Sequence, residues 1–402
     1  MAFKLNILQQ APTMPAYLDN SATTPLAPEV IQRMEEVRAR TQANASSVHR
    51  SGQMARVILE ESRQQIAEII GAEPKEIIFT SGGTEANNLA LKGIALRQKA
   101  DRGVWPTFFV PRTEHHAVLH PAQFLAQIGA PIRMLGVNNE GRTEPQELRD
   151  ALAEAGGSNA CPVVSVMHAN NETGTLNPIA ELAEITHQAG GVFHTDAVQT
   201  FGKLPLNVRD TGVDMATFSA HKIHGPKGIG ALYLRKEIEL EPLIHGGAQE
   251  RNRRGGTESP ELAAGFATAA RLCASQLEQS AALFRQLNNE LRELLQSIPD
   301  LRIITPANGV LPNIVNATFA DAERLDGEGL IVGMDLAGIA VSNGSACASG
   351  SQQPSHVLLA MGLPAAQARA AVRFSFSRLT TPHDVQAAAA ALREVVQRQR
   401  GK

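Results

Sequence analysis

Lys222 is the residue of this 402-residue chain whose surroundings most plainly indicate chemistry. The segment 218–228 places it after an apolar run, beside the hydroxyl of Ser219 and the imidazole of His221, and before a glycine-rich turn. A lysine is costly to bury unless it is paired or chemically committed, and the usual commitment is a Schiff base with a carbonyl cofactor such as pyridoxal phosphate. Ser219 and His221 would then bind the cofactor phosphate. The short motif alone fits a surface lysine in a loop before a helix equally well.

The segment 81–85 is a candidate phosphate loop between a predicted strand and a predicted helix. Glycines such as Gly83 let the backbone approach an anion, and a helix N-terminus presents free N–H groups and a positive dipole. The hydroxyl of Thr84 can add a hydrogen bond to a phosphate. The alternative is an ordinary helix start with Thr84 as its cap.

Two further polar segments follow predicted strands and offer groups for a cofactor ring. In 113–117, His115 could stack on a ring or move protons near neutral pH, whereas His116 is expected to be only a helix cap. In 168–174, Asn171 could hydrogen-bond a ring hydroxyl, with an ordinary Asx turn as the alternative.

The segment 193–199 ends another predicted strand with a carboxylate and an amide. Asp196 can pair with a pyridine nitrogen and keep it protonated, which makes the ring an electron sink. Gln199, three residues later, lies on the same face of the following turn and can reach the ring oxygen. An aspartate at a strand end is also a common helix cap, so the segment alone leaves both uses open.

The elements that must position these groups alternate between strand-like and helix-like patterns from Ala27 to about Met215. The predicted strands are 76–79, 108–111, 132–135, 163–167 and 192–195, and the predicted helices are 29–40, 55–70, 144–155 and 179–189, with another helix from about residue 86. This alternation predicts βαβ units, a mainly parallel sheet and helices on both of its faces, which is an α/β fold. In such sheets, sites gather at the carboxyl ends of the strands.

After about Ala264 the pattern changes. We expect a long helix to about residue 295, apolar strands at 303–304 and 314–319, a Ser/Gly/Asn-rich loop at 342–355 and a final helix near 384–398. This order predicts a smaller α+β domain. The predicted organisation is therefore an N-terminal extension at 1–15, a large cofactor-binding domain at 16–264 and a small domain at 265–402.

The composition excludes several classes of protein. Apolar residues make up 43% and charged residues 19%, as in globular enzymes. The net charge of −3, without a long block of one sign, gives no reason to expect nucleic acid or an anionic membrane as a partner. Three cysteines do not suggest a disulfide scaffold, and the N-terminus does not resemble a secretory signal, so we expect a cytoplasmic protein.

Taken in chain order, the phosphate loop, the histidine, the asparagine, the aspartate and the lysine resemble those of class V aminotransferase-fold pyridoxal-phosphate enzymes, specifically cysteine desulfurases of the NifS/IscS type. Matching motifs run from Tyr17 almost to the C-terminus, and they include 17–25, 44–49, 167–172, 245–247, 254–257 and 343–349. The resemblance implies the fold of aspartate-aminotransferase-like transferases, with a mainly parallel seven-stranded sheet in the large domain. It also implies that the segment after residue 15 can pack on the small domain.

The resemblance also implies a role for each matching residue. Lys222 would be the Schiff-base lysine, Asp196 the partner of the pyridine nitrogen, and His115 the stacking and proton-transfer residue. Asn171 and Gln199 would hold the ring oxygen, and Gly83, Thr84, Ser219 and His221 the phosphate. Thr257 would reach the phosphate of a neighbouring subunit in a homodimer, and Arg373 would clamp the substrate carboxylate with the help of Asn44 and Asn171. An arginine fork suits a planar carboxylate, although a surface ion pair is the ordinary alternative for Arg373.

Cys347 decides the reaction. Its loop of Ser, Asn, Gly and Ala has no apolar residues to bury it, whereas Cys161 and Cys273 are expected to be buried and inert. The resemblance implies that its thiolate attacks the sulfur of L-cysteine, which leaves alanine and a persulfide on Cys347. A cysteine or cystine C–S lyase, or a selenocysteine lyase, remains an alternative on the same fold, but it would not need this cysteine. A non-catalytic scaffold relative is disfavoured because every cofactor residue is present.

The physiological sulfur acceptor stays open at this stage. Iron–sulfur cluster assembly and tRNA thiolation are both compatible with a persulfide donor. No resident metal is expected, and Cys347 could ligate an iron–sulfur cluster transiently with a scaffold partner.

The chain departs from the family at Asn44-Ala45, where a proline commonly follows the asparagine, and at 351–354, which replaces an acidic stretch. It also ends at Lys402, without the longer tail that some relatives use to dock a scaffold.

Overall fold

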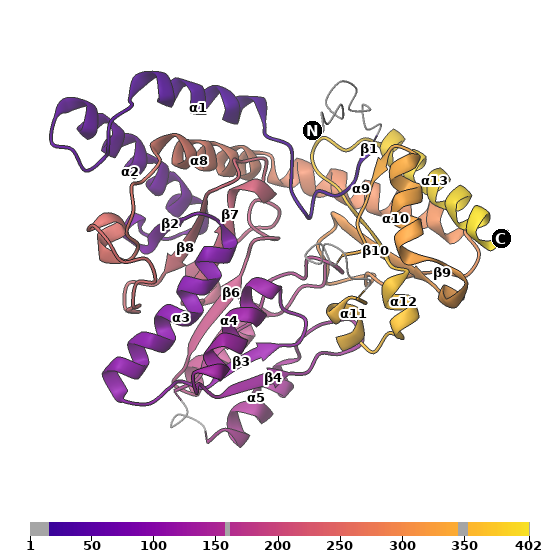
Figure 1. Ribbon diagram of the computed structural model, residues 1–402, viewed down its shortest axis with the longest axis horizontal. Coiled ribbons are helices and arrows are strands. Elements are labelled where there is room, and N and C mark those ends of the chain that lie inside the picture. Colours follow the sequence, from indigo (N-terminus) through magenta and orange to yellow (C-terminus); the bar gives the residue numbers. More distant parts are fainter. Residues whose placement is uncertain (1–15, 157–160, 345–352, 402) are drawn as a thin grey trace, which may run out of the picture.

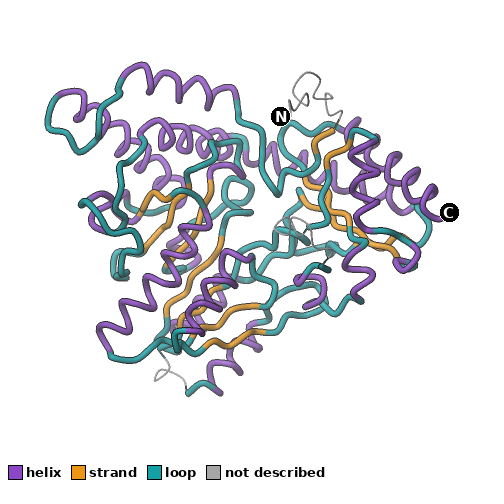
Figure 2. The backbone as a smooth tube through the Cα atoms, in the orientation of Figure 1, coloured by secondary structure: helices purple, strands orange, loops and turns teal. Residues whose placement is uncertain are grey.

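The structure is a computed structural model that describes residues 16–156, 161–344 and 353–401 (Figure 1). Figure 2 shows strands gathered in two separate places, each flanked by helices. The larger group forms a seven-stranded sheet, and the smaller group contains a three-stranded sheet. Cys347 and most of its predicted loop lie outside the described residues.

The seven-stranded sheet is mainly parallel, as the sequence predicted. Its strands are β2 (Ile77–Thr80), β3 (Phe108–Pro111), β4 (Ile132–Leu135), β5 (Val163–Ser165), β6 (Val192–Asp196), β7 (Met215–Ser219) and β8 (Gly230–Leu234). They lie in the order β2-β8-β7-β6-β5-β3-β4. Only β8 runs against its neighbours in this sheet, so all the other strands end at the same edge.

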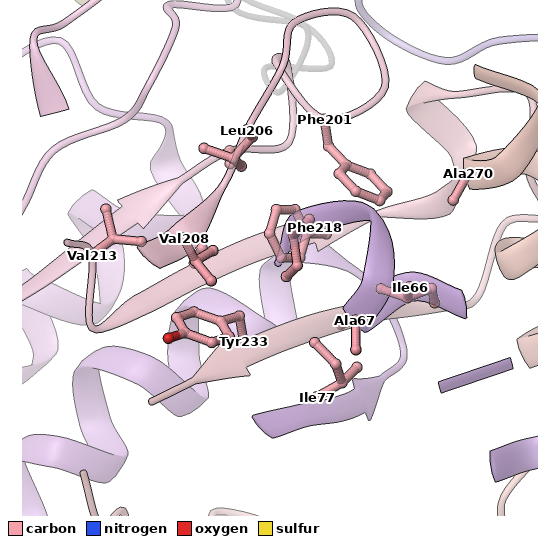
Figure 3. Close-up of a cluster of buried hydrophobic side chains, with 14 of the residues drawn as sticks. Ile66, Ala67, Ile77, Phe201, Leu206, Val208, Val213, Phe218, Tyr233 and Ala270 are labelled. Atoms are coloured by element: carbon pink, nitrogen blue, oxygen red, sulfur yellow. The ribbon is translucent and has the colours of Figure 1, made fainter. Parts of the chain in front are cut away.

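Helices cover both faces of this sheet. They are α1 (Pro28–Arg40), α2 (Arg50–Ile70), α3 (Gly83–Arg102), α4 (His116–Gln127), α5 (Pro145–Glu154), α6 (Ile179–Gln188), α7 (Val208–Thr211) and α8 (Pro260–Ser275). Successive strand residues point to opposite faces, so Phe108 enters the core with α3 and α4, whereas Phe109 enters the core with α2, α6 and α8. Figure 3 shows part of the core that contains Phe109, where Phe218 and Tyr233 of the sheet lie with Ile66 of α2. These buried faces fix the sheet and thereby its polar strand ends.

The remaining elements surround a second core. β12 (Val372–Ser375), β10 (Ile314–Phe319) and β9 (Leu301–Ile303) form an antiparallel sheet, and β1 (Ala16–Tyr17) pairs in parallel with β11 (Ile339–Ala340). The helices of this part are α9 (Leu277–Gln296), α10 (Gly327–Leu336), α11 (His356–Ala360), α12 (Ala365–Arg369) and α13 (Pro382–Arg400). Leu18 packs in the core formed by α9, α10, α13 and these strands. The boundary predicted between residues 264 and 265 falls inside α8, and the division into domains stays a prediction.

Sequence patterns located most elements but missed some of their limits. The strands at 108–111, 132–135 and 314–319 have the bounds that were predicted. The single helix expected from about 264 to 295 is wrong, because α8 and α9 are separate helices that meet at Gln276, whose backbone is not helical. The strands β1, β8, β11 and β12 were not predicted, and the apolar run that forms β7 was given no bounds. No helix of the described ranges is long and apolar enough to cross a membrane.

Candidate functional site

A cavity of about 300 Å³ lies at the carboxyl ends of the parallel strands. His115 reaches it from beyond β3, Asp196 from the end of β6 and Ser219 from the end of β7. The start of α3 and Arg373 of β12 complete further parts of its wall. The cavity therefore lies between the strand ends of the seven-stranded sheet and the three-stranded sheet that contains β12.

Lys222 extends into this cavity from the short helical turn that follows β7. Its Nζ donates hydrogen bonds to the carbonyl oxygens of Ser21, at 2.5 Å, and of Ala22, at 2.8 Å. Burial lowers the pKa of Lys222 to about 7, and the positive charges of Arg373 and Lys203 add to the effect. The amine is thus available in its neutral, nucleophilic form near neutral pH.

Asp196 lines the cavity and is held by two hydrogen bonds. Its Oδ1 accepts from the backbone N–H of Val198 at 3.0 Å, and its Oδ2 accepts from Nδ2 of Asn87 at 2.7 Å. Asn87 lies on α3 and also lines the cavity. Sequence reasoning did not assign Asn87 to the site, although its position one turn after Thr84 places both side chains on the same face of the helix.

His115 combines a structural contact with a place in the cavity. It is the N-cap of α4, where its Nδ1 accepts a hydrogen bond from the N–H of Ala117 at 3.0 Å. Because Nδ1 accepts, the proton of the neutral ring is on Nε2. Burial lowers the pKa of His115, which favours this neutral form. The prediction that His116 is the cap is wrong, since His116 is already the first residue of the helix.

Two neighbouring asparagines in the turn after β5 have different roles. Asn170 makes the Asx turn, because its Oδ1 accepts from the N–H groups of Glu172, at 2.8 Å, and Thr173, at 3.0 Å. Asn171 lines the cavity, and its carbonyl oxygen accepts from Nη1 of Arg373 at 2.8 Å. The Asx-turn alternative therefore belongs to Asn170.

The start of α3 presents an uncapped helix N-terminus to the cavity. Its N-cap is Gly82, which provides no side-chain cap, so the expected alternative of Thr84 as a cap is wrong. Gly83, Thr84 and Ser219 line this part of the wall. The buried Oγ of Ser219 has no hydrogen-bond partner within the described parts of the chain. Free N–H groups and an unpaired hydroxyl suit an anionic group.

His221 and Gln199 line the same cavity as Lys222. Nδ1 of His221 lies 3.1 Å from Oγ1 of Thr23, and burial lowers the pKa of this imidazole to about 4, with a further contribution from Lys222. Nε2 of Gln199 donates to the carbonyl oxygen of Ser21 at 3.0 Å. Its buried Oε1 lacks a partner in the described residues and can accept a further hydrogen bond.

Arg373 is almost completely buried, with 1% of its surface exposed, so the surface alternative for this residue is wrong. Nη2 donates to Oδ1 of Asp19 at 2.8 Å, and Nη1 donates to the carbonyl oxygen of Asn171. Its Nε has no partner among the described atoms. The Arg373 side chain lines the cavity, and the planar set of N–H donors of a guanidinium suits a carboxylate.

Some predicted site residues do not join the cavity in this single chain. Asn44 is exposed, and its Oδ1 accepts from the N–H of Ser46 at 2.8 Å. Thr257 is also exposed. Cys161 and Cys273 were expected to be buried, and both are only half-buried. Burial nevertheless raises the pKa of the Cys273 thiol.

Comparison with known proteins identifies the family of this chain. The model of the aminotransferase class-V family matches residues 16–388. The chain belongs to this family. It is 42% identical over 387 residues to "Cysteine desulfurase IscS" of Dictyoglomus turgidum, covering 96% of this chain and 95% of the relative. It is 41% identical over 387 residues to "IscS-like cysteine desulfurase" of Mycobacterium tuberculosis, covering 96% of this chain and 97% of that one.

Solved structures give the same family relationship. A "NIFS-LIKE PROTEIN" superposes with a TM-score of 0.87 at 32% identity, over 95% of this chain and 99% of the other. "SspA in complex with cysteine" superposes with a TM-score of 0.78 at 32% identity, over 91% of this chain and all of that one. These likenesses confirm the predicted fold class and family. Enzymes of this family generally depend on pyridoxal phosphate.

Proposed function

We propose that this protein is a cysteine desulfurase that converts L-cysteine to L-alanine and holds the sulfur as a persulfide on Cys347. The observation that carries the proposal is Lys222, a lysine whose pKa is about 7 and which lines a cavity together with groups suited to a phosphorylated pyridine. The names of the relatives support the choice of reaction.

The residues present fit pyridoxal phosphate. We infer that the free N–H groups at the start of α3, the Ser219 hydroxyl, Thr84 and His221 bind its phosphate. Asp196 would accept a hydrogen bond from the protonated ring nitrogen, and Gln199 and Asn171 would face the ring oxygen. When bound, the protonated ring supplies an electron sink for substrate carbanions.

The residues of the chain have distinct tasks in this proposal. Lys222 attaches the cofactor and, in its neutral form, takes the proton from Cα of the substrate. His115 would stack on the ring of the cofactor, and its Nε2–H is available to donate a hydrogen bond. Arg373 would bind the substrate carboxylate through its guanidinium, and its contact with Asp19 fixes the orientation of the fork.

The sulfur step needs Cys347 as a thiolate. Its sulfur attacks the thiol sulfur of the substrate, a new S–S bond forms and the substrate C–S bond breaks. The electron pair of the broken bond remains on the substrate carbon, which is protonated and becomes the methyl group of alanine. The balance is one cysteine and one enzyme thiol converted to one alanine and one enzyme persulfide.

We further propose a homodimer in which exposed Thr257 reaches the phosphate site of the partner subunit. Asn44, which is exposed in the single chain, would assist Arg373 in binding the substrate in the homodimer. The persulfide would be delivered to an acceptor protein, such as an iron–sulfur scaffold, or to tRNA thiolation. We also propose that the enzyme is cytoplasmic.

The experiment that tests the function compares wild type with Cys347→Ala after reconstitution with pyridoxal phosphate. We expect wild type to release alanine from L-cysteine and, with a thiol reductant, an equivalent amount of sulfide. Cys347→Ala should keep the visible absorption of the bound cofactor but lose alanine formation. Full alanine and sulfide production by Cys347→Ala would instead support a C–S lyase. Unchanged cofactor absorption in Lys222→Ala would contradict the assignment of the attachment site.

A further inference from the structure

Glu85 is a carboxylate at the start of α3 that the reaction above does not use. It is the third residue of the helix and directly follows Thr84 of the candidate phosphate site. Its Oε2 accepts a hydrogen bond from the backbone N–H of Ser81 at 2.7 Å, so the side chain reaches back to the turn before the helix. Glu85 also lines a second cavity of about 360 Å³, which shares the residues of the candidate phosphate site with the first: Gly83, Thr84, Ser219 and His221.

Arg254 is the ion partner of Glu85. Its Nε donates to Oε1 of Glu85 at 2.8 Å, and its Nη2 donates to Oε2 at 3.2 Å, so the pair is bidentate. Both side chains are partly buried, with 15% of Glu85 and 22% of Arg254 exposed. Burial raises the pKa of Glu85, but the hydrogen bonds from Arg254 and Ser81 outweigh burial and hold this pKa below its ordinary value. The carboxylate is therefore charged at neutral pH, and the guanidinium balances its charge.

The loop that carries Arg254 has other attachments to the fold. Oε2 of Glu250, four residues earlier, accepts from the backbone N–H of Phe79 in β2 at 3.1 Å. The N–H of Gly255, the next residue, donates to the carbonyl oxygen of Ile244 at 2.8 Å. We therefore expect the loop to keep its place without the ion pair. A substitution of Arg254 should change the charge beside α3 rather than the path of the chain.

We propose that the Arg254–Glu85 pair sets the affinity of the phosphate site, because Arg254 cancels a carboxylate charge that would otherwise repel the cofactor phosphate. A phosphate ester carries nearly two negative charges at neutral pH, and charges in a partly buried site interact more strongly than in water. Glu85 holds the helix start through Ser81, and Arg254 makes this arrangement compatible with an anion. Arg254 is a positioning residue, since it acts on the phosphate through Glu85, and the inference rests on the proposed function.

The test measures the Kd for pyridoxal phosphate by absorbance titration of the cofactor-free full chain as wild type, Arg254→Gln, Glu85→Gln and the double variant. We expect Arg254→Gln to raise this Kd about 10- to 30-fold, because it leaves the charge of Glu85 unbalanced beside the phosphate. Glu85→Gln should leave the Kd equal or lower it, because the charge of Arg254 then attracts the phosphate. The double variant lacks both charges, and its Kd should lie within about threefold of the wild-type value.

Pyridoxal, which lacks the phosphate, is the matched control ligand. Its Kd should change by less than about threefold in every variant, because it brings no negative charge close to Glu85. Arg149→Gln and Glu181→Gln are the matched control variants, since each breaks an exposed ion pair of 3.0 Å between α5 and α6. Both should leave the Kd for pyridoxal phosphate within about twofold of the wild-type value.

A double variant that binds pyridoxal phosphate no better than Arg254→Gln would overturn the proposal, because removing the second member of a merely structural pair does not restore binding. An Arg254→Gln variant within about threefold of wild type, or one that loses as much affinity for pyridoxal, would overturn it as well. If wild type binds no pyridoxal phosphate, the proposed function fails. The same order of affinities, measured with inorganic phosphate by titration calorimetry, then still decides the role of the pair.

Discussion

Lys222→Met should stabilise the cofactor-free protein at pH 7 and destabilise it at pH 10. The folded pKa of Lys222 is about 7, below the ordinary value of 10.5, so the unfolded chain binds more protons between these values. Wild type therefore loses stability as the pH falls from about 10.5 to about 7, and the loss is complete below the folded pKa. Methionine has a similar shape and carries no charge, so it removes this loss.

The magnitude follows from the two pKa values. At 1.36 kcal/mol for each tenfold change, the unfolding free energy lost by wild type is about 4 kcal/mol at pH 7 and about 1 kcal/mol at pH 10. The variant also loses the hydrogen bonds to Ser21 and Ala22, at about 1 kcal/mol each. Relative to wild type, the free energy of unfolding of Lys222→Met is therefore about 2 kcal/mol higher at pH 7 and about 1 kcal/mol lower at pH 10.

The assay is urea unfolding of cofactor-free wild type and Lys222→Met at pH values from 7 to 10, followed by circular dichroism. Other titrating groups are common to both proteins and cancel in the difference. Lys227→Met, which changes an exposed lysine nearby, should differ from wild type by less than about 0.5 kcal/mol throughout. A variant that is less stable than wild type at pH 7, or a difference that does not change with pH, would refute the reasoning.

Three other substitutions have expected outcomes. Glu250→Gln breaks the buried ion pair with Arg63, whose Nη1 lies 2.6 Å from Oε2 of Glu250. We expect the free energy of unfolding, measured in urea, to fall by about 3–5 kcal/mol, and a decrease below about 1 kcal/mol would contradict a stabilising role of the pair. In steady-state assays, Arg373→Lys should raise KM for L-cysteine about 10- to 100-fold and change kcat less, because lysine cannot form the planar fork that binds a carboxylate. An unchanged KM would show that Arg373 does not bind the substrate carboxylate. Asn87→Ala should weaken cofactor binding about tenfold in an absorbance titration, because the bond to Asp196 is charge-assisted; equal affinity would show that Asp196 does not need Asn87.

The sequence was sufficient to predict the fold class and most of the cavity. Strand ends that carry His115, Asp196 and Ser219 were visible because short apolar runs stop at polar residues, and parallel strands bring such ends to one edge. The class V resemblance then gave each residue a role. Phe108 and Phe109 show why the layers were predictable, since alternation along a strand assigns each side chain to a face.

Contacts between distant segments could not be predicted from local patterns. Asn87 looked like part of a helix start, and only the packing of α3 against the end of β6 brings it to Asp196. Glu172 looked like one polar residue in a turn, and its partner Ser355 is 183 positions away. Which of two adjacent residues caps a helix or makes a turn was also beyond the sequence, because His115 and His116, like Asn170 and Asn171, have the same chemistry.

The central claim is that sulfur moves from L-cysteine to Cys347. Peptide mass spectrometry of the reconstituted enzyme, mixed with L-cysteine without reductant and then alkylated, tests it most directly. We predict that the peptide containing Cys347 gains the mass of one sulfur atom, in an amount equal to the alanine formed in one turnover, and that Lys222→Ala shows no such gain. Alanine formed in the first turnover without added sulfur on Cys347 would contradict the account.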